Sequence, residues 1–288
     1  MSDPRLTPAR PDLAALHLKG QIEAARYAEP VERVIGVPIA PLTSRPEPQA
    51  SLATQLLWGE GFTVYEDAGL WAWGQSVRDG YVGYLPSPCL EPPKRLGTPT
   101  HRIAALSAPV YPAPDFKARA EGQLPYGARV SVAEIVPGNQ AEYARLHSGG
   151  FVAAAHLGEA APDWVAEAEA LLGAPYVWGG RSPLGLDCSA LVQLGLQAAG
   201  REAPRDADQQ EATLGATLAE EAALTRGDLV FWQGHVGLMI DATHLLHANI
   251  HHMRVATEPL AEAVARIEAK GEGRPTRLAR LDAEAAPG

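Results

Sequence analysis

The chain has 288 residues, of which 46% are hydrophobic and 20% charged, and its formal net charge is −10 at pH 7. A chain of this length and composition can bury a sizeable core, and it predicts a globular protein of two or three domains. The acidic balance argues against nucleic acid or an anionic membrane as a partner, because both bind basic surfaces. The sequence contains no apolar run as long as the roughly 18 residues of a membrane-spanning helix.

Cysteine usage and the first residues predict a cytoplasmic location. Cys89 and Cys188 are the two cysteines, and two cysteines in different segments do not make a disulfide framework. The segment 1–8 lacks the basic-then-apolar order of a signal peptide. We therefore expect a reducing environment in which a free thiol persists.

The first 33 residues are polar and contain several prolines, which is typical of an appendage rather than a domain. Within this segment the stretch 13–27 predicts a short helix. Residues 34–95 and 96–159 then share an internal repeat of short alternating strands and turn residues, in which Gly59 and Gly127 stand 68 positions apart. Such units predict two small β-barrels.

The peptide Gly185–Gln193 places Cys188 where a glycine-punctuated loop turns into an amphipathic helix that should stop at Gly200. A thiol in the first helical turn faces unpaired backbone N–H groups and the positive end of the helix dipole. Both favour the thiolate and can lower a cysteine pKa from about 8.5 to roughly 3.5–7.5. The alternative is a buried structural cysteine, which behaves as a small hydrophobe.

A candidate general base follows in the next predicted strands. Residues 227–232 read as one strand and His235–Ile240 as a second, with His235 at its first position. A third short strand carries His247, which a neighbouring antiparallel strand can place against His235. The pattern predicts a triad of nucleophile, base and a group that orients the base.

These blocks together resemble the NlpC-type cell-wall cysteine peptidases. The resemblance covers residues 160–288 and rests on four ordered motifs, which are Tyr176–Gly180, Asp187–Ser189, Gly227–Phe231 and His235–Gly237. It implies an α+β, papain-like catalytic domain with helices packed on a small antiparallel sheet. It also implies that the two preceding units are SH3-like β-barrels, as in the subgroup that recycles murein peptides.

The same resemblance implies the roles of individual residues. Cys188 matches the nucleophile, His235 the base and His247 the third polar residue, with no cofactor and no metal. The implied substrate is a murein tripeptide or tetrapeptide with a free N-terminal L-alanine, cleaved after γ-D-glutamate and before the diamino acid. Candidate substrate contacts in the catalytic domain are Tyr176, Asp187, Ser189, Arg205 and Asp206, and in the first barrel Glu47, Glu60, Tyr81 and Tyr84.

Four alternatives stay open at this point. The enzyme could degrade the intact wall, or the same thioester could be captured by an amine or alcohol in an acyltransferase. The chain could also bind murein peptides without cleaving them. Finally, His247 and His251 stand four residues apart and could hold a metal, although the surrounding alternation predicts a strand rather than a helix.

Overall fold

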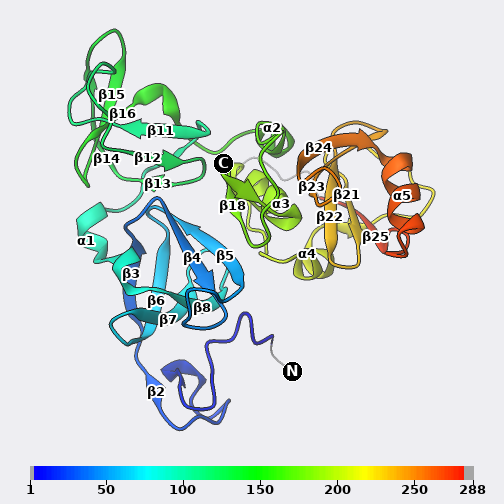
Figure 1. The fold of residues 1–288 in the computed structure, drawn as a ribbon, viewed down its shortest axis with the longest axis horizontal. Coiled ribbons are helices and arrows are strands. Elements are labelled where there is room, and N and C mark those ends of the chain that lie inside the picture. The colour runs from blue at the N-terminus through cyan, green and yellow to red at the C-terminus, as the bar shows by residue number, and fades with distance from the viewer. Residues whose placement is uncertain (1–2, 282–288) are drawn as a thin grey trace. The chain divides into compact units, whose positions relative to one another are not determined.

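The computed structural model describes residues 3–281, which belong to two compact units, 1–159 and 160–288. Both units are built mainly of short strands, with few helices (Figure 1). Among the described residues no helix is long and apolar enough to cross a membrane.

The N-terminal segment does not form the helix that its sequence predicts. Residues 13–27 contain only a two-residue strand β1 (Ala14–Ala15), a 3₁₀ turn (Leu16–Leu18) and the start of a parallel partner strand, β2 (Tyr27–Ala28). A single helix of this length is marginal in water. Here Gly20, with φ of 85°, turns the chain back instead.

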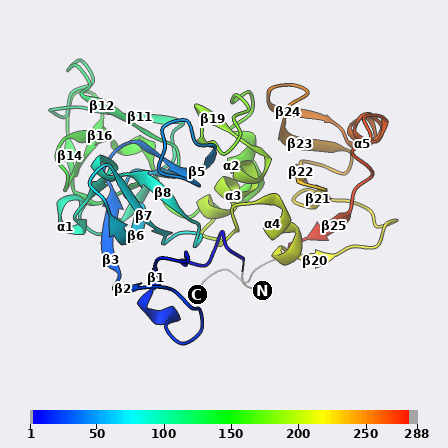
Figure 2. The same cartoon turned by 60° about the horizontal axis from the view of Figure 1, so that its bottom comes forward.

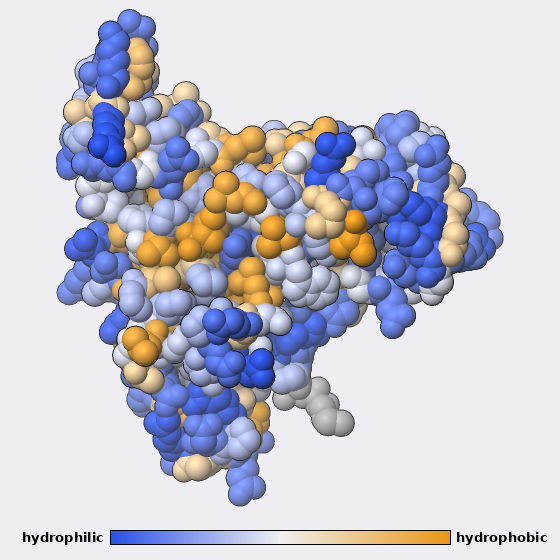
Figure 3. Space-filling view, viewed as in Figure 1, coloured by the Kyte–Doolittle hydropathy of each residue, from blue (hydrophilic) through white to orange (hydrophobic). Residues whose placement is uncertain are grey.

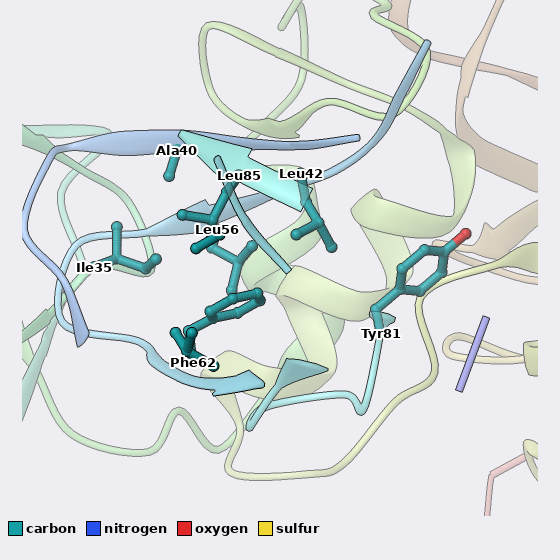
Figure 4. Packing of buried hydrophobic residues seen from close by; sticks show 9 residues of the cluster. Ile35, Ala40, Leu42, Leu56, Phe62, Tyr81 and Leu85 are labelled. Atoms are coloured by element: carbon teal, nitrogen blue, oxygen red, sulfur yellow. The ribbon is translucent and has the colours of Figure 1, made fainter. Parts of the chain in front are cut away.

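The first half of the N-terminal unit is a seven-stranded antiparallel sheet in the order β5-β4-β8-β7-β6-β3-β9. Its strands are β3 (Val31–Ile35), β4 (Ile39–Thr43), β5 (Leu52–Leu57), β6 (Gly61–Asp67), β7 (Trp71–Ser76), β8 (Val82–Pro86) and β9 (Leu90–Glu91), and a 3₁₀ turn (Ser87–Cys89) precedes the last. Alternate residues of these strands point inward and form one core (Figure 4). That core contains Ile35, Ala40, Leu42, Leu56, Phe62, Val64, Ala72, Tyr81 and Leu85.

A short helix α1 (Pro93–Leu96) leads into the second half, which has its own core around Ile103, Val130 and Leu146. Its strands are β10 (His101–Ile103), β11 (Ser107–Val110), β12 (Gly122–Pro125), β13 (Arg129–Val130), β14 (Val132–Pro137), β15 (Glu142–Leu146), β16 (Phe151–Ala153) and β17 (Leu157–Gly158), with a 3₁₀ turn (Ala154–His156) before β17. They form three small sheets, β13-β10-β17, β11-β12 and β14-β15-β16.

Gly59 and Gly127 occupy equivalent turns in the two halves. Both have positive φ, 78° and 84°. The N–H of Gly59 donates to the carbonyl of Ile35, and the N–H of Gly127 donates to that of Ile103, each at 2.9 Å. The two acceptors are also 68 positions apart, so the spacing seen in the sequence corresponds to a repeated backbone feature.

The C-terminal unit contains a six-stranded sheet in the order β20-β25-β21-β22-β23-β24. Helices α2, α3 and α4 lie on one side of this sheet and α5 lies on the other (Figures 1 and 2). The elements are α2 (Trp164–Glu169), β18 (Arg181–Ser182), β19 (Gly185–Leu186), α3 (Cys188–Ala198), α4 (Ala207–Thr213), β20 (Ala216–Thr217), β21 (Leu229–Trp232), β22 (His235–Met239), β23 (His244–Asn249), β24 (Arg254–Pro259), α5 (Leu260–Ala269) and β25 (Arg277–Arg280).

Candidate active site

Cys188 is the first residue of α3, and Asp187 caps this helix by accepting a 2.9 Å hydrogen bond from the N–H of Ala190. Helix α3 ends before Gly200, whose φ is 77°, as the sequence predicts. The Cys188 side chain is 7% exposed, and its sulfur accepts hydrogen bonds from the backbone N–H groups of Ser189 and Val236. The nucleophile candidate therefore lies beside the start of β22, one residue from His235.

Asp187 and Arg205 form a buried ion pair next to the nucleophile. The guanidinium of Arg205 donates to both carboxylate oxygens of Asp187, at 2.9 Å and 2.7 Å, and to Ser189 Oγ at 2.9 Å. Asp187 also accepts from the N–H of Gly179 at 2.9 Å. Arg205 is 1% exposed, so its guanidinium is directed at the start of α3 rather than at solvent.

The environment of Cys188 does not lower its pKa as the helix position alone predicts. Burial and the negative charge of Asp187 raise the pKa of the thiol to about 12, against the opposing effects of the Val236 N–H and Arg205. Loss of solvation outweighs the helix N-terminus because the sulfur is almost fully covered. This environment therefore favours the neutral thiol of Cys188 over its thiolate.

His235 and His247 contact one another across β22 and β23. Met239 pairs with Leu245 and Leu238 with Leu246, and continuing this register puts His247 opposite Gly237, two residues from His235 on the same face. His235 Nε2 and His247 Nδ1 are 2.9 Å apart. Burial, the neighbouring His247 and the positive charge of Arg266 together lower the pKa of His235 to about 3, against the opposing charge of Glu258.

Glu258 of β24 is a site residue that the sequence reading missed. Its Oε1 lies 2.7 Å from His247 Nε2, and it also forms an ion pair with Arg266 of α5. His247 pairs with Ala256, so Glu258, two residues further on, is its diagonal neighbour on the same face. The signal was present in the sequence as a lone acidic residue in the strand after His247, but the strand register is needed to interpret it.

A cavity of about 360 Å³ opens at the two histidines. Its lining includes Tyr176, Trp178, His235, His247, Asn249, His251, Arg266 and Lys270. Burial raises the pKa of the Tyr176 hydroxyl, and the nearby Cys188 and Asp187 act in the same direction. The space beside the two histidines thus has aromatic and cationic walls, with room for a peptide group.

The other substrate-contact candidates of this unit have structural partners. Ser189 is buried and receives the hydrogen bond from Arg205 described above. Asp206 is the N-cap of α4, where it forms a capping box with Gln209.

The candidates of the N-terminal unit differ in environment. Glu60 is 4% exposed and accepts from the N–H of Leu57 in a tight turn. Tyr81 belongs to the core, with its hydroxyl pointing away from the cluster (Figure 4). Tyr84 accepts a 2.8 Å hydrogen bond from Arg10, which also stacks 4.4 Å from the Trp73 ring centroid, while Glu47 is exposed.

The structure does not bring His247 and His251 together as the pair of metal ligands that their i, i+4 spacing suggests. Within residues 3–281 the group with metal-ligand proximity is His247, His252 and Glu258, whose ligand atoms lie within 4.8 Å of one another. His251 is not in this group, because β23 ends at Asn249 and the chain then turns. Both ring nitrogens of His247 already have hydrogen-bond partners, His235 and Glu258.

Comparison with protein families gives two matches along the chain. Residues 173–270 match the NlpC/P60 family, and residues 42–89 match the bacterial dipeptidyl-peptidase SH3 domain. The chain therefore carries an NlpC/P60 domain preceded by an SH3-like domain. The resemblance drawn from the four sequence motifs is therefore confirmed.

Curated relatives of this chain have related names. A gamma-D-glutamyl-L-lysine dipeptidyl-peptidase of Bacillus cereus is 26% identical over 238 residues, 73% of this chain and 71% of the relative. Its namesake in Bacillus subtilis is 41% identical over 86 residues, 27% of this chain and 28% of the relative. Dipeptidyl-peptidase 6 of Lysinibacillus sphaericus is 38% identical over 90 residues, 31% of this chain and 32% of the relative.

Among solved structures, an NlpC/P60 family protein from Bacillus cereus superposes with a TM-score of 0.71. It is 20% identical, and the match covers 87% of this chain and 99% of that one. At this identity the comparison shows a shared fold, which extends over most of both chains.

Proposed function

We propose that the protein is a cysteine peptidase that hydrolyses the bond between γ-D-glutamate and the diamino acid of murein peptides with a free N-terminal L-alanine. The observation that carries the proposal is the convergence of Cys188, His235 and His247 from α3, β22 and β23 in an NlpC/P60 domain. The γ-D-glutamyl specificity is proposed from the names of the relatives in Bacillus cereus and Bacillus subtilis. The proposed domains are an appendage 1–33, two SH3-like barrels 34–95 and 96–159, and a papain-like catalytic domain 160–288.

In the proposed reaction, Cys188 Sγ attacks the carbonyl carbon of the γ-glutamyl amide while His235 takes the thiol proton. A neutral thiol beside a neutral imidazole suits this order of events, because proton transfer accompanies formation of the C–S bond. His235 then protonates the leaving amine of the diamino acid, and the C–N bond breaks. Water, deprotonated by the same imidazole, hydrolyses the thioester and restores the free thiol.

The tetrahedral intermediate carries a negative charge on oxygen that needs donors already in place. Backbone N–H groups in the first turn of a helix point outward along the axis and can donate hydrogen bonds to this oxygen. Cys188 begins α3, so we propose its own N–H as one donor of the oxyanion hole. Tyr176, which lines the cavity at His235 and His247, is the proposed side-chain contact on the substrate.

Recognition of a free α-amine requires a carboxylate or an aromatic face, and we propose that the first SH3-like domain provides it. Glu47, Glu60, Tyr81 and Tyr84 are the candidates from this domain. Glu47 is the exposed carboxylate of the set, whereas Glu60 is buried in its turn. A recycling role in a reducing compartment fits the two free thiols, Cys89 and Cys188.

The test is to incubate the purified protein with L-Ala-γ-D-Glu-meso-diaminopimelate and to follow free dipeptide by mass spectrometry. We expect release of L-Ala-D-Glu and diaminopimelate, and no release by Cys188→Ala. Binding without cleavage would support a non-catalytic binder. A new amide formed with an added amine would support an acyltransferase, and faster release from intact peptidoglycan would support a wall-degrading enzyme.

A further inference from the structure

We propose that Glu258, held by Arg266, is a positioning residue that fixes the tautomers of both histidines, so that Nδ1 of His235 is the nitrogen that takes the thiol proton. The inference rests on the proposed cysteine-peptidase chemistry and adds a fourth member to the array. None of the motifs that mark the catalytic domain includes Glu258 or Arg266.

The contacts form one chain of hydrogen bonds from α5 to the base. Arg266 forms an ion pair with Glu258, Glu258 Oε1 lies 2.7 Å from His247 Nε2, and His247 Nδ1 lies 2.9 Å from His235 Nε2. The side chains of His247 and Glu258 are 1% and 10% exposed, so little water competes for these bonds. Glu258 joins β24 to the site while Arg266 joins α5 to it, and neither element carries a residue of the proposed triad.

The ionisation of Glu258 determines which ring nitrogen of each histidine carries the hydrogen. Burial by itself would raise the pKa of Glu258, but the hydrogen bond to His247 and the charge of Arg266 together lower it to about 2. A carboxylate can only accept, so His247 Nε2 must carry the hydrogen. A neutral His247 then has a bare Nδ1, which accepts from His235 Nε2–H.

The remaining nitrogen of a neutral His235 is Nδ1, which has a lone pair. Burial favours the neutral state of both His235 and His247, and the positive charge of Arg266 lowers both pKa values in the same direction. Glu258 is the negatively charged group that opposes these effects and raises the pKa of His247. The array therefore presents a single protonation pattern to the Cys188 thiol.

The variant Glu258→Gln tests this directly because it keeps the size of the side chain. A glutamine can either donate to or accept from His247 Nε2, so the reversed tautomer becomes accessible. In that reversed form His235 Nδ1 carries the hydrogen and cannot accept the thiol proton. The matched control is Glu268→Gln on α5, an exposed position where the surface over the helix is mostly hydrophilic (Figure 3).

We expect Glu258→Gln to lower kcat at least about tenfold with little change in KM, because orientation of the base matters most in the transition state. Glu268→Gln should match the wild type. In the wild type, nitrogen NMR of the imidazoles should show His247 protonated at Nε2 and His235 protonated at Nε2, and Glu258→Gln should show a mixture. Glu258→Asp, which keeps the charge, should recover part of the lost rate and the wild-type tautomer.

Two results would overturn the inference. One is a wild-type spectrum with His247 protonated at Nδ1. The other is a Glu258→Gln enzyme whose kcat and tautomers equal those of Glu268→Gln. Because the NMR measurement needs no substrate, it separates this inference from the proposed reaction, which fails on its own if the wild type releases no dipeptide.

Discussion

Arg205 donates two hydrogen bonds to the carboxylate of Asp187, and this pair lies directly behind the proposed nucleophile. Asp187 in turn caps α3 and receives the N–H of Gly179, so one carboxylate ties together the helix start, the preceding loop and Arg205. The orientation of Cys188 therefore depends on a side chain 17 positions later in the sequence.

Replacing Arg205 should therefore destabilise the C-terminal unit. Arg205→Met removes the partner of a buried carboxylate, and breaking such a pair costs about 3–5 kcal/mol. Arg205→Lys should also lower stability, because an ammonium cannot make the two parallel bonds. The measurement is the free energy of unfolding by denaturant titration, with the exposed Arg274→Met as control. Equal stabilities of Arg205→Met and the control would contradict this account.

His247 should matter less for turnover than Cys188. If His247 only orients His235, then His247→Ala leaves nucleophile and base in place and retains a measurable kcat, whereas Cys188→Ala retains none. Steady-state assays on the tripeptide, with circular dichroism to verify folding, provide the comparison. A His247→Ala enzyme as inactive as Cys188→Ala would assign His247 a direct part in the chemistry.

The residues that the sequence could identify are those with local signals. Cys188 could be predicted as a candidate nucleophile because the signals for a loop, for a helix start and for the helix end at Gly200 all lie close to it in the sequence. His235 and His247 followed from strand alternation and from the short turn between neighbouring strands. Glu258 required the exact pairing of β23 with β24, which a sequence pattern gives only to within a residue or two.

The protonation state of Cys188 could not be predicted because it depends on long-range burial. The helix N-terminus is visible in the sequence and favours the thiolate. The covering of the sulfur by β22 and the proximity of the Asp187 charge are not visible, and together they reverse the direction of the pKa shift. For a similar reason the local pattern of residues 13–27 predicts a helix that does not form. The N–H of Ala14 donates to the carbonyl of Arg26 and the N–H of Ala15 to that of Pro8, and these contacts hold the backbone extended.

The free enzyme should contain little thiolate at neutral pH. With the pKa of Cys188 raised to about 12, ultraviolet thiolate absorbance at neutral pH should match that of Cys188→Ala, and should grow only in strongly alkaline solution. Alkylation by iodoacetamide should correspondingly be slow and accelerate as the pH rises. The Cys188→Ala variant separates the signal from that of Cys89, whose pKa burial also raises. Strong thiolate absorbance at neutral pH would show that the resting state is an ion pair instead.

Mild acid should destabilise the C-terminal unit through His235. Its pKa is about 3 in the folded protein and about 6.5 when unfolded, so the unfolded state binds the proton first. The contribution of neutral His235 to the free energy of unfolding is complete above about pH 6.5. Below that pH it falls by up to about 1.4 kcal/mol per pH unit. Denaturant titrations between about pH 6.5 and 4.5, above the usual carboxylate range, should show this slope, which His235→Asn should reduce.

A blocked substrate should be a poor one if the first SH3-like domain recognises the free amine. An ammonium bound by a carboxylate in a partly desolvated site contributes strongly, and its loss leaves the carboxylate unpaired, at a cost of several kcal/mol. N-acetylating the L-alanine of the tripeptide should therefore lower kcat/KM by about two orders of magnitude or more, since about 1.4 kcal/mol corresponds to a factor of ten. The comparison of free and acetylated tripeptide should be repeated with Glu47→Gln, the exposed candidate, and with Glu32→Gln as a matched surface control in the same domain. If Glu47 binds the amine, Glu47→Gln should lower kcat/KM for the free tripeptide. It should also reduce the ratio of kcat/KM between the free and the acetylated tripeptide. Equal rates on both substrates in the wild type would remove the amine requirement and favour a hydrolase of the intact wall.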